Sequence, residues 1–181
     1  MIYRFVIISA EVPGFRRDLR ISGSDTFLRL HDALMADLGF DPKEPSVFRI
    51  TDNRWNPTED IYLYDMGMMD SDEELHLMKD TYLDSFLNTA KQRLLLTFDL
   101  IGNRSFNMEL REITLGADLK EPEISRSEGL PPVQTTSPEE FLSSASAANT
   151  ASEDYSFSEE EEGLSEGDLD GLDITTEEDQ L

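Results

Sequence analysis

Residues 93–113 read RLLLTFDLIGNRSFNMELREI, and this stretch decides the fold. Its two apolar runs, Arg93–Leu100 and Ser105–Ile113, flank Gly102-Asn103, a pair typical of a tight turn between antiparallel strands. The sequence therefore predicts a β-hairpin, with Leu96 and Leu110 in the core.

The clearest helix signal lies earlier in the chain. Phe27, Leu30, Leu34 and Leu38 follow one another at steps of three and four, which places them on one face of a helix. Several residues between Ser22 and Asp25 can cap its start, and Gly39 supplies a stop. We predict a helix whose Leu30 and Leu34 point into the core.

The other predicted elements surround these two. Ile2–Ala10 and Phe15–Ile21 form a second hairpin across Pro13-Gly14, with Val6 and Ile8 expected in the core. Two short strands are predicted at Val47–Thr51 and Ile61–Tyr64. A polar loop at Gly67–Glu74 and a short second helix after Thr81 follow them. The order ββα-β-β-αββ predicts a single α+β domain, with a mostly antiparallel or mixed sheet and helices on one face.

Charge divides the chain into two parts. The 181 residues carry 15 Lys and Arg against 39 Asp and Glu, a net charge of -24. Residues 121–181 hold 18 of the acidic residues and one basic residue, Arg126, and they are rich in Ser, Pro and Gly. A segment with so little apolar surface does not offset the cost of ordering its backbone. We therefore predict a folded domain at 1–118 and a disordered acidic tail at 119–181.

Composition also excludes several classes of protein. The absence of cysteine excludes disulfide scaffolds, thiolate zinc sites and thiol nucleophiles. No apolar run approaches the roughly 18 residues that a membrane span needs, and the N-terminal run is too short for a signal peptide. We expect a cytoplasmic chain without membrane association. Its negative charge opposes direct binding of nucleic acid.

Four residues of the domain are weak catalytic candidates: Arg16, Arg17, His31 and Asp99. His31 lies on the apolar face of the first helix, where a histidine is a general base or, more simply, a buried structural side chain. Arg16 and Arg20 share one face of the strand and Arg17 lies on the other, so the three do not form one continuous patch. They pair with nearby acidic residues or bind a phosphate or carboxylate. Trp55 is expected to anchor a loop. His76 has no second histidine at ligand spacing, so we expect no metal and no cofactor.

The acidic tail contains candidate partner-binding residues. Apolar side chains stand among acids there, as in short motifs that fold onto a basic, apolar groove. The alternative is a simply solvated segment. The partner-binding candidates are Phe157, Glu159, Glu160, Glu161, Glu162, Leu164, Leu169 and Leu172.

Several segments in this order resemble the plasmid pRiA ORF-3-like family, whose members are also called transposon passenger proteins. The resemblance covers about residues 1–115 and rests on Phe15-Arg16-Arg17, Thr26–His31, Val47–Ile50, Trp55, Glu59–Leu63, Leu83–Leu87, Leu95–Leu100 and Met108–Leu110. It is closest to the versions of Bacteroides-type genomes, in which an acidic tail also follows. The family's Tyr-Asp-Phe-Gly-Asp hairpin is only partly kept here, as Phe98-Asp99 followed by Leu100-Ile101-Gly102-Asn103. The family implies no established activity.

Three functional hypotheses follow. The first is a non-enzymatic binding module with an unidentified, basic protein partner and an unspecified oligomeric state. The second is a hydrolase or nucleic-acid-processing accessory with a site near Arg16, Arg17, His31 and Asp99. In the third, the acidic tail mimics nucleic acid and occupies a DNA-binding protein. Convergence of Arg17, His31 and Asp99 in one pocket would favour the second hypothesis.

Overall fold

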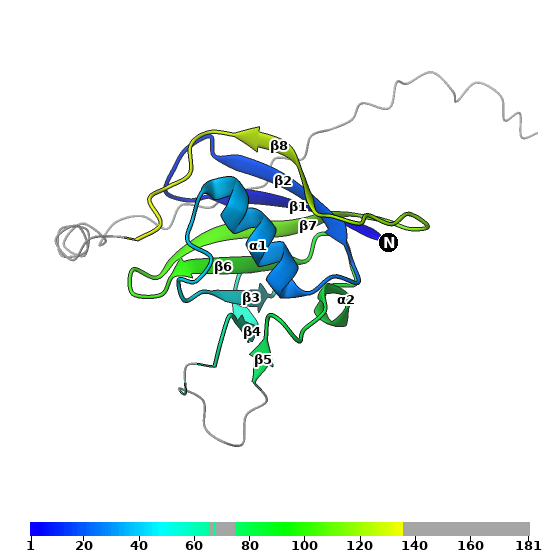
Figure 1. The fold of residues 1–181 in the computed structure, drawn as a ribbon, viewed down its shortest axis with the longest axis horizontal. Helices are drawn as coiled ribbons and strands as arrows, with labels where there is room; N and C mark the ends of the chain where they lie inside the picture. The colour runs from blue at the N-terminus through cyan, green and yellow to red at the C-terminus, as the bar shows by residue number, and fades with distance from the viewer. Residues whose placement is uncertain (66, 68–74, 136–181) are drawn as a thin grey trace, which may run out of the picture. The chain divides into compact units, whose positions relative to one another are not determined.

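The computed structural model describes residues 1–65, 67 and 75–135 of the chain (Figure 1). They form an eight-stranded sheet in the order β5-β4-β3-β6-β7-β1-β2-β8, in which only the β4–β5 pair is parallel. The strands are β1 (Ile2–Ser9), β2 (Arg16–Ser22), β3 (Val47–Thr51), β4 (Pro57–Tyr62), β5 (His76–Leu77), β6 (Arg93–Asp99), β7 (Arg104–Thr114) and β8 (Glu123–Glu128). The α+β class and the mixed, mostly antiparallel sheet are confirmed.

Helix α1 (Phe27–Leu38) crosses one face of this sheet (Figure 1). Thr26, one residue beyond the predicted caps, accepts a hydrogen bond from the Arg29 amide at the start of the helix. Gly39 ends it in the left-handed conformation, with φ of 69°. Helix α2 (Leu83–Phe86) is a single turn, shorter than predicted, and the Leu83 amide donates to the Asp25 carbonyl just before α1 at 2.9 Å.

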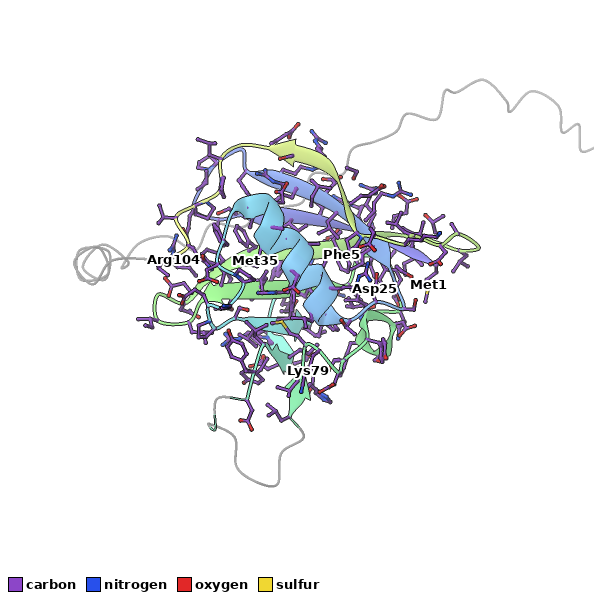
Figure 2. All side chains as sticks on the ribbon, in the orientation of Figure 1. Met1, Phe5, Asp25, Met35, Lys79 and Arg104 are labelled. Carbon is purple, nitrogen blue, oxygen red and sulfur yellow. The ribbon has the colours of Figure 1, made fainter. Side chains whose placement is uncertain are left out.

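The core lies between α1 and the sheet. Leu30, Leu34, Leu96 and Leu110 are fully buried, as predicted. Aromatic side chains fill much of the remaining space, and Phe5 and Met35 are labelled in this layer in Figure 2. Val6 is also buried, at 1% exposure, but it lies opposite Asp18 and Glu109 on the other face of the sheet, outside the main core cluster. The prediction for Ile8 was wrong, because Ile8 is only half-buried.

The predicted domain boundary at residue 118 does not match the structure. Residues Glu123–Glu128 form β8, which pairs with β2 in antiparallel register, from Arg16 opposite Glu128 to Arg20 opposite Glu123. Ile124 is its one apolar residue, so the sequence pattern carries almost no strand signal. The unpaired edge of β2 supplies the hydrogen bonds that make this segment a strand.

Two smaller differences concern the other edge of the sheet. Strand β4 begins at Pro57, four residues before the predicted start, and β5 was not predicted. The predicted loop at Gly67–Glu74 lies outside the described residues except for Gly67. Within the described part of the chain, no helix has the length and apolar character needed to cross a membrane.

Candidate functional site

Arg17 lies on the helix side of β2, where it joins three elements. Its Nε donates to Asp37 of α1 at 2.6 Å, and a terminal nitrogen donates to the Glu128 carbonyl of β8, also at 2.6 Å. The guanidinium lies 4.7 Å from the centre of the Phe15 ring. Only 5% of the residue is exposed. Arg17 therefore holds β8 and α1 against β2.

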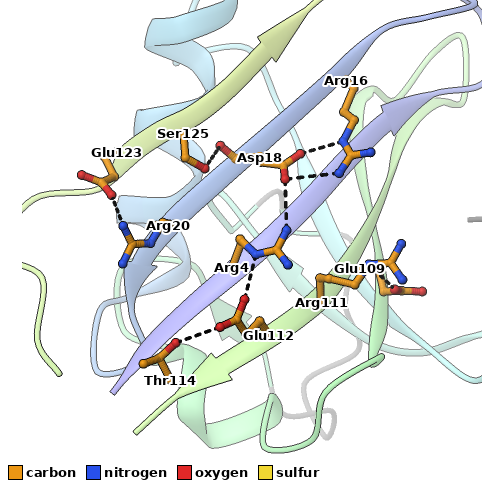
Figure 3. A network of polar contacts seen from close by, with 10 residues as sticks. All are labelled: Arg4, Arg16, Asp18, Arg20, Glu109, Arg111, Glu112, Thr114, Glu123 and Ser125. Carbon is orange, nitrogen blue, oxygen red and sulfur yellow. Dashed lines mark hydrogen bonds and ion pairs between the residues drawn. The ribbon is translucent and has the colours of Figure 1, made fainter. Parts of the chain in front are cut away.

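Arg16 points to the opposite face of the same strand, as its position predicts. Its Nε donates to Asp18 at 2.8 Å, and Asp18 also accepts from Arg4 of β1 at 3.1 Å (Figure 3). Arg4 also donates a hydrogen bond from its Nε to Glu112 of β7. Arg16 and Arg17 thus belong to separate sets of contacts on the two sides of the sheet.

His31 is fully buried on the core side of α1. Its Nδ1 lies 3.0 Å from a carboxylate oxygen of Asp32, and its Nε2 has no hydrogen-bond partner. Burial lowers the pKa of His31, and the hydrogen bond to Asp32 opposes this shift. His31 is therefore a packed side chain of the core, closed off from solvent. His76 lies elsewhere, with Nε2 3.3 Å from Glu59.

Asp99 organises the turn between β6 and β7. It accepts a hydrogen bond from the Gly102 amide at 2.8 Å and lies 3.5 Å from Arg104. A Cβ on Gly102 would come within 2.6 Å of an Asp99 carboxylate oxygen, so a larger residue here would displace the Asp99 side chain. Arg104, labelled in Figure 2, also donates hydrogen bonds to the Glu11 carboxylate, and these bonds are the main cause of the raised pKa of Arg104.

The four catalytic candidates therefore do not meet. Arg17, His31 and Asp99 each contact a different set of residues, and Arg16 lies on the other face of the sheet. A contact between two of them joins neighbours in sequence: Arg17 donates to the backbone carbonyl of Arg16 at 2.9 Å. The described residues also contain no group of three or more His, Asp or Glu that could hold a metal ion.

The sequence did not reveal the extent of a charged surface of the domain, the sheet face opposite α1. We call it the polar face and define it by Arg4, Arg16, Asp18, Arg20, Arg49, Arg93, Glu109 and Arg111. Asp18 and Glu109 are almost completely buried, at 5% and 2% exposure. Figure 3 shows Asp18 paired with Arg4 and Arg16, and Glu109 beside Arg111 of the same strand. Alternation of charge at Arg16-Asp18-Arg20 was visible in the sequence, and the predicted hairpin placed β1 beside these residues, but the sequence did not show that β8 lies on their other side.

Trp55 anchors the turn between β3 and β4, in agreement with its expected role. Its ring lies 5.0 Å from the guanidinium carbon of Arg93, and its backbone φ is 67°. The partner-binding candidates of the tail lie outside the described residues: Phe157, Glu159, Glu160, Glu161, Glu162, Leu164, Leu169 and Leu172.

Comparison with known proteins finds a similar fold and does not indicate an activity. No protein-family model matches the chain, and no curated protein matches it. The crystal structure of MM3350, a protein of unknown function from Methanosarcina mazei Go1, aligns with a TM-score of 0.53 at 17% identity. The alignment covers 70% of this chain and 68% of that one. At this identity the similarity concerns the fold alone.

Proposed function

We propose that this chain is a cytoplasmic, non-enzymatic binding module of the plasmid pRiA ORF-3-like family, whose acidic C-terminal region binds a basic protein. The observation that carries the proposal is the dispersal of Arg16, Arg17, His31 and Asp99. A hydrolase needs its nucleophile, base and charge-stabilising groups around one substrate. Here each candidate has a structural partner of its own, which argues against the hydrolase hypothesis.

The C-terminal region supplies the attraction in this proposal. Residues 136–181 contain 15 acidic residues and no Lys or Arg. Such a segment attracts a basic surface over long distances, until salt screens it at about 8 Å under physiological conditions. Phe157, Leu164, Leu169 and Leu172 would add apolar contacts that salt does not weaken. The folded domain serves as the scaffold that carries this region.

The test separates the two contributions on the full-length protein. Partners are captured from native lysate, purified, and titrated against the wild-type chain and a variant with Phe157, Leu164, Leu169 and Leu172 changed to Ser. This variant keeps the full charge of the tail. The matched control changes four exposed apolar residues of the folded part to Ser: Ile101, Leu115, Leu130 and Val133.

We expect wild-type binding that weakens with salt, a weaker complex for the tail variant at every salt concentration, and unchanged binding for the control. Binding that is insensitive to salt, or a control as defective as the tail variant, would contradict the proposal. If DNA and this chain compete for binding to the captured protein, that protein is a DNA-binding protein. Such competition would favour nucleic-acid mimicry by the tail.

A further inference from the structure

Residues 123–135 lie across the domain as a strap. The first part of the strap is β8, which pairs with the edge of β2, and the second part, residues 129–135, continues toward the β6–β7 turn (Figure 1). Pro132 is the one buried residue of this second part, and the side chains of Leu130 and Val133 are exposed. A segment that buries so few apolar side chains opens at a lower cost than unfolding of the whole domain.

Two arginines hold the strap by its main chain. Arg17 donates to the carbonyl oxygens of Glu128 at 2.6 Å and Gly129 at 3.3 Å. Arg104 donates to the carbonyl oxygen of Gln134 at 3.4 Å, near the other end of the segment. Because every residue has a carbonyl group, these contacts fix an extended backbone without selecting its side chains. Peptides that add a strand to the edge of a sheet are bound in the same way.

Three positions of the strap do select side chains. Gly129 has a φ of 67°, and a Cβ there would lie 2.8 Å from the carbonyl oxygen of Gly14, so this position requires glycine. Pro132 is buried. The side-chain amide of Gln134 accepts a hydrogen bond from the Asp41 amide at 2.7 Å and donates one to the Asp41 carbonyl at 2.9 Å. The strap therefore fits its surroundings through the pattern Gly-x-x-Pro-x-Gln.

The strap passes an aromatic cluster at this end of the domain. The ring centre of Phe106 lies 5.2 Å from that of Phe15 and 6.2 Å from that of Phe40. Gly129 lies against the backbone of Phe15, and Gln134 pairs with the residue that follows Phe40. Extended segments that contain proline commonly dock beside aromatic side chains, because their backbone is already stiff before binding.

We propose that the surface covered by the strap is a binding site for an extended peptide of a partner protein with the pattern Gly-x-x-Pro-x-Gln. The strap is an internal competitor, and its contacts show how such a peptide is held. A tethered segment competes at an effective concentration of about 1 mM, so a partner must bind more tightly than the strap does. This site lies on the folded domain, so its failure leaves the proposed partner binding by the acidic tail untouched.

The test titrates the full-length, nitrogen-15-labelled protein with a synthetic peptide of residues 123–135. Amide signals of β8 report release of the protein's own strap, and the Asp41 amide reports a bound glutamine side chain. In the wild type, exchange should be half complete at about 1 mM peptide. The variant Gln134→Ala should need about tenfold less peptide, because its strap loses two hydrogen bonds and the added peptide restores them.

Altered peptides test which positions are selected. Gly129→Ala in the peptide should weaken binding about tenfold or more, because the added methyl group meets the Gly14 carbonyl. Gln134→Ala in the peptide should weaken it similarly. The matched control is a peptide with both Leu130→Ser and Val133→Ser, which should bind within about twofold because these side chains are 81% and 74% exposed in the strap. Unspecific apolar binding would give the opposite order.

Thermal unfolding establishes that Gln134→Ala is folded, and the wild-type titration does not depend on that variant. The proposal is overturned if neither protein exchanges its strap at about 10 mM peptide, well above the effective concentration of the tethered segment. It is also overturned if the peptide with Gly129→Ala binds as well as the original, or if the control peptide is the weaker of these two. Light scattering should show a monomer. A wild-type dimer that forms with rising concentration would assign the site to the strap of a second copy and overturn its assignment to a partner protein.

Discussion

Replacing Arg17 by Met should destabilise the domain strongly, because Arg17 joins β2, α1 and β8. The change keeps a long apolar stem against Phe15 and removes the donors to Asp37, Glu128 and Gly129. Breaking one side of a buried ion pair usually costs about 3–5 kcal/mol. The Asp37 side chain keeps 20% exposure, so we expect a loss near the lower limit, about 3 kcal/mol.

This loss can be measured by urea unfolding and by calorimetry of the full-length protein. For a domain of this size it corresponds to a fall in Tm of about 10 °C. Hydrogen exchange adds a local measurement, because the amides of β8 should lose protection more than those of the central strands β1 and β7. Arg20→Gln on the same strand is the control, since its ion pair with Glu123 is half exposed and should contribute at most about 1 kcal/mol. A loss below about 1 kcal/mol for Arg17→Met, or uniform loss of protection, would refute the structural role of Arg17.

Three further predictions follow from the fold. A chain ending at residue 118 lacks β8, so its Tm should lie below that of a chain ending at residue 135, and equal values would contradict the role of β8. Leu30→Ala and Leu34→Ala should each cost about 2–5 kcal/mol in urea unfolding, since both side chains are fully buried, and a loss below about half a kcal/mol would contradict their core position. Because burial lowers the pKa of His31, its contribution is complete above the unfolded pKa of about 6.5 and is lost as the pH falls below that value. Stability of the wild type should therefore fall more steeply between about pH 6.5 and 5 than that of His31→Gln, and parallel curves would contradict this.

Elements with a strong local signal could be predicted from the sequence. Helix α1 combines apolar spacing with a cap and a stop glycine, and β6 and β7 flank a strong turn signal, so their positions were correct to within one or two residues. In these segments local preference and tertiary packing favour the same structure. Strand β8 lacks such a signal and depends on the edge of β2. Helix α2 was predicted but is shorter than expected, and its Leu83 amide donates to the Asp25 carbonyl before α1.

The candidate site was less predictable for the same reason. The residue types of Arg16, Arg17, His31 and Asp99 suggested chemistry, but their function depends on what lies opposite them in space. Arg17 contacts Glu128 across 111 positions of sequence, through a strand that composition had assigned to the tail. No periodicity within β2 contains that information.

The polar face illustrates how precisely register controls such a site. Between Arg4 and Phe5, the pairing of β1 with β7 shifts from Glu112 to Leu110, so Arg111 is an additional residue on β7. A second shift occurs between Thr97 and Asp99 in the pairing of β6 with β7. Because side chains alternate between faces, moving β7 by one residue would turn Glu109 toward the core and expose Met108 or Leu110. Burial of those two apolar residues therefore fixes Glu109 on the polar face, opposite Arg93, and the packing of the core determines where the charged groups of the polar face meet.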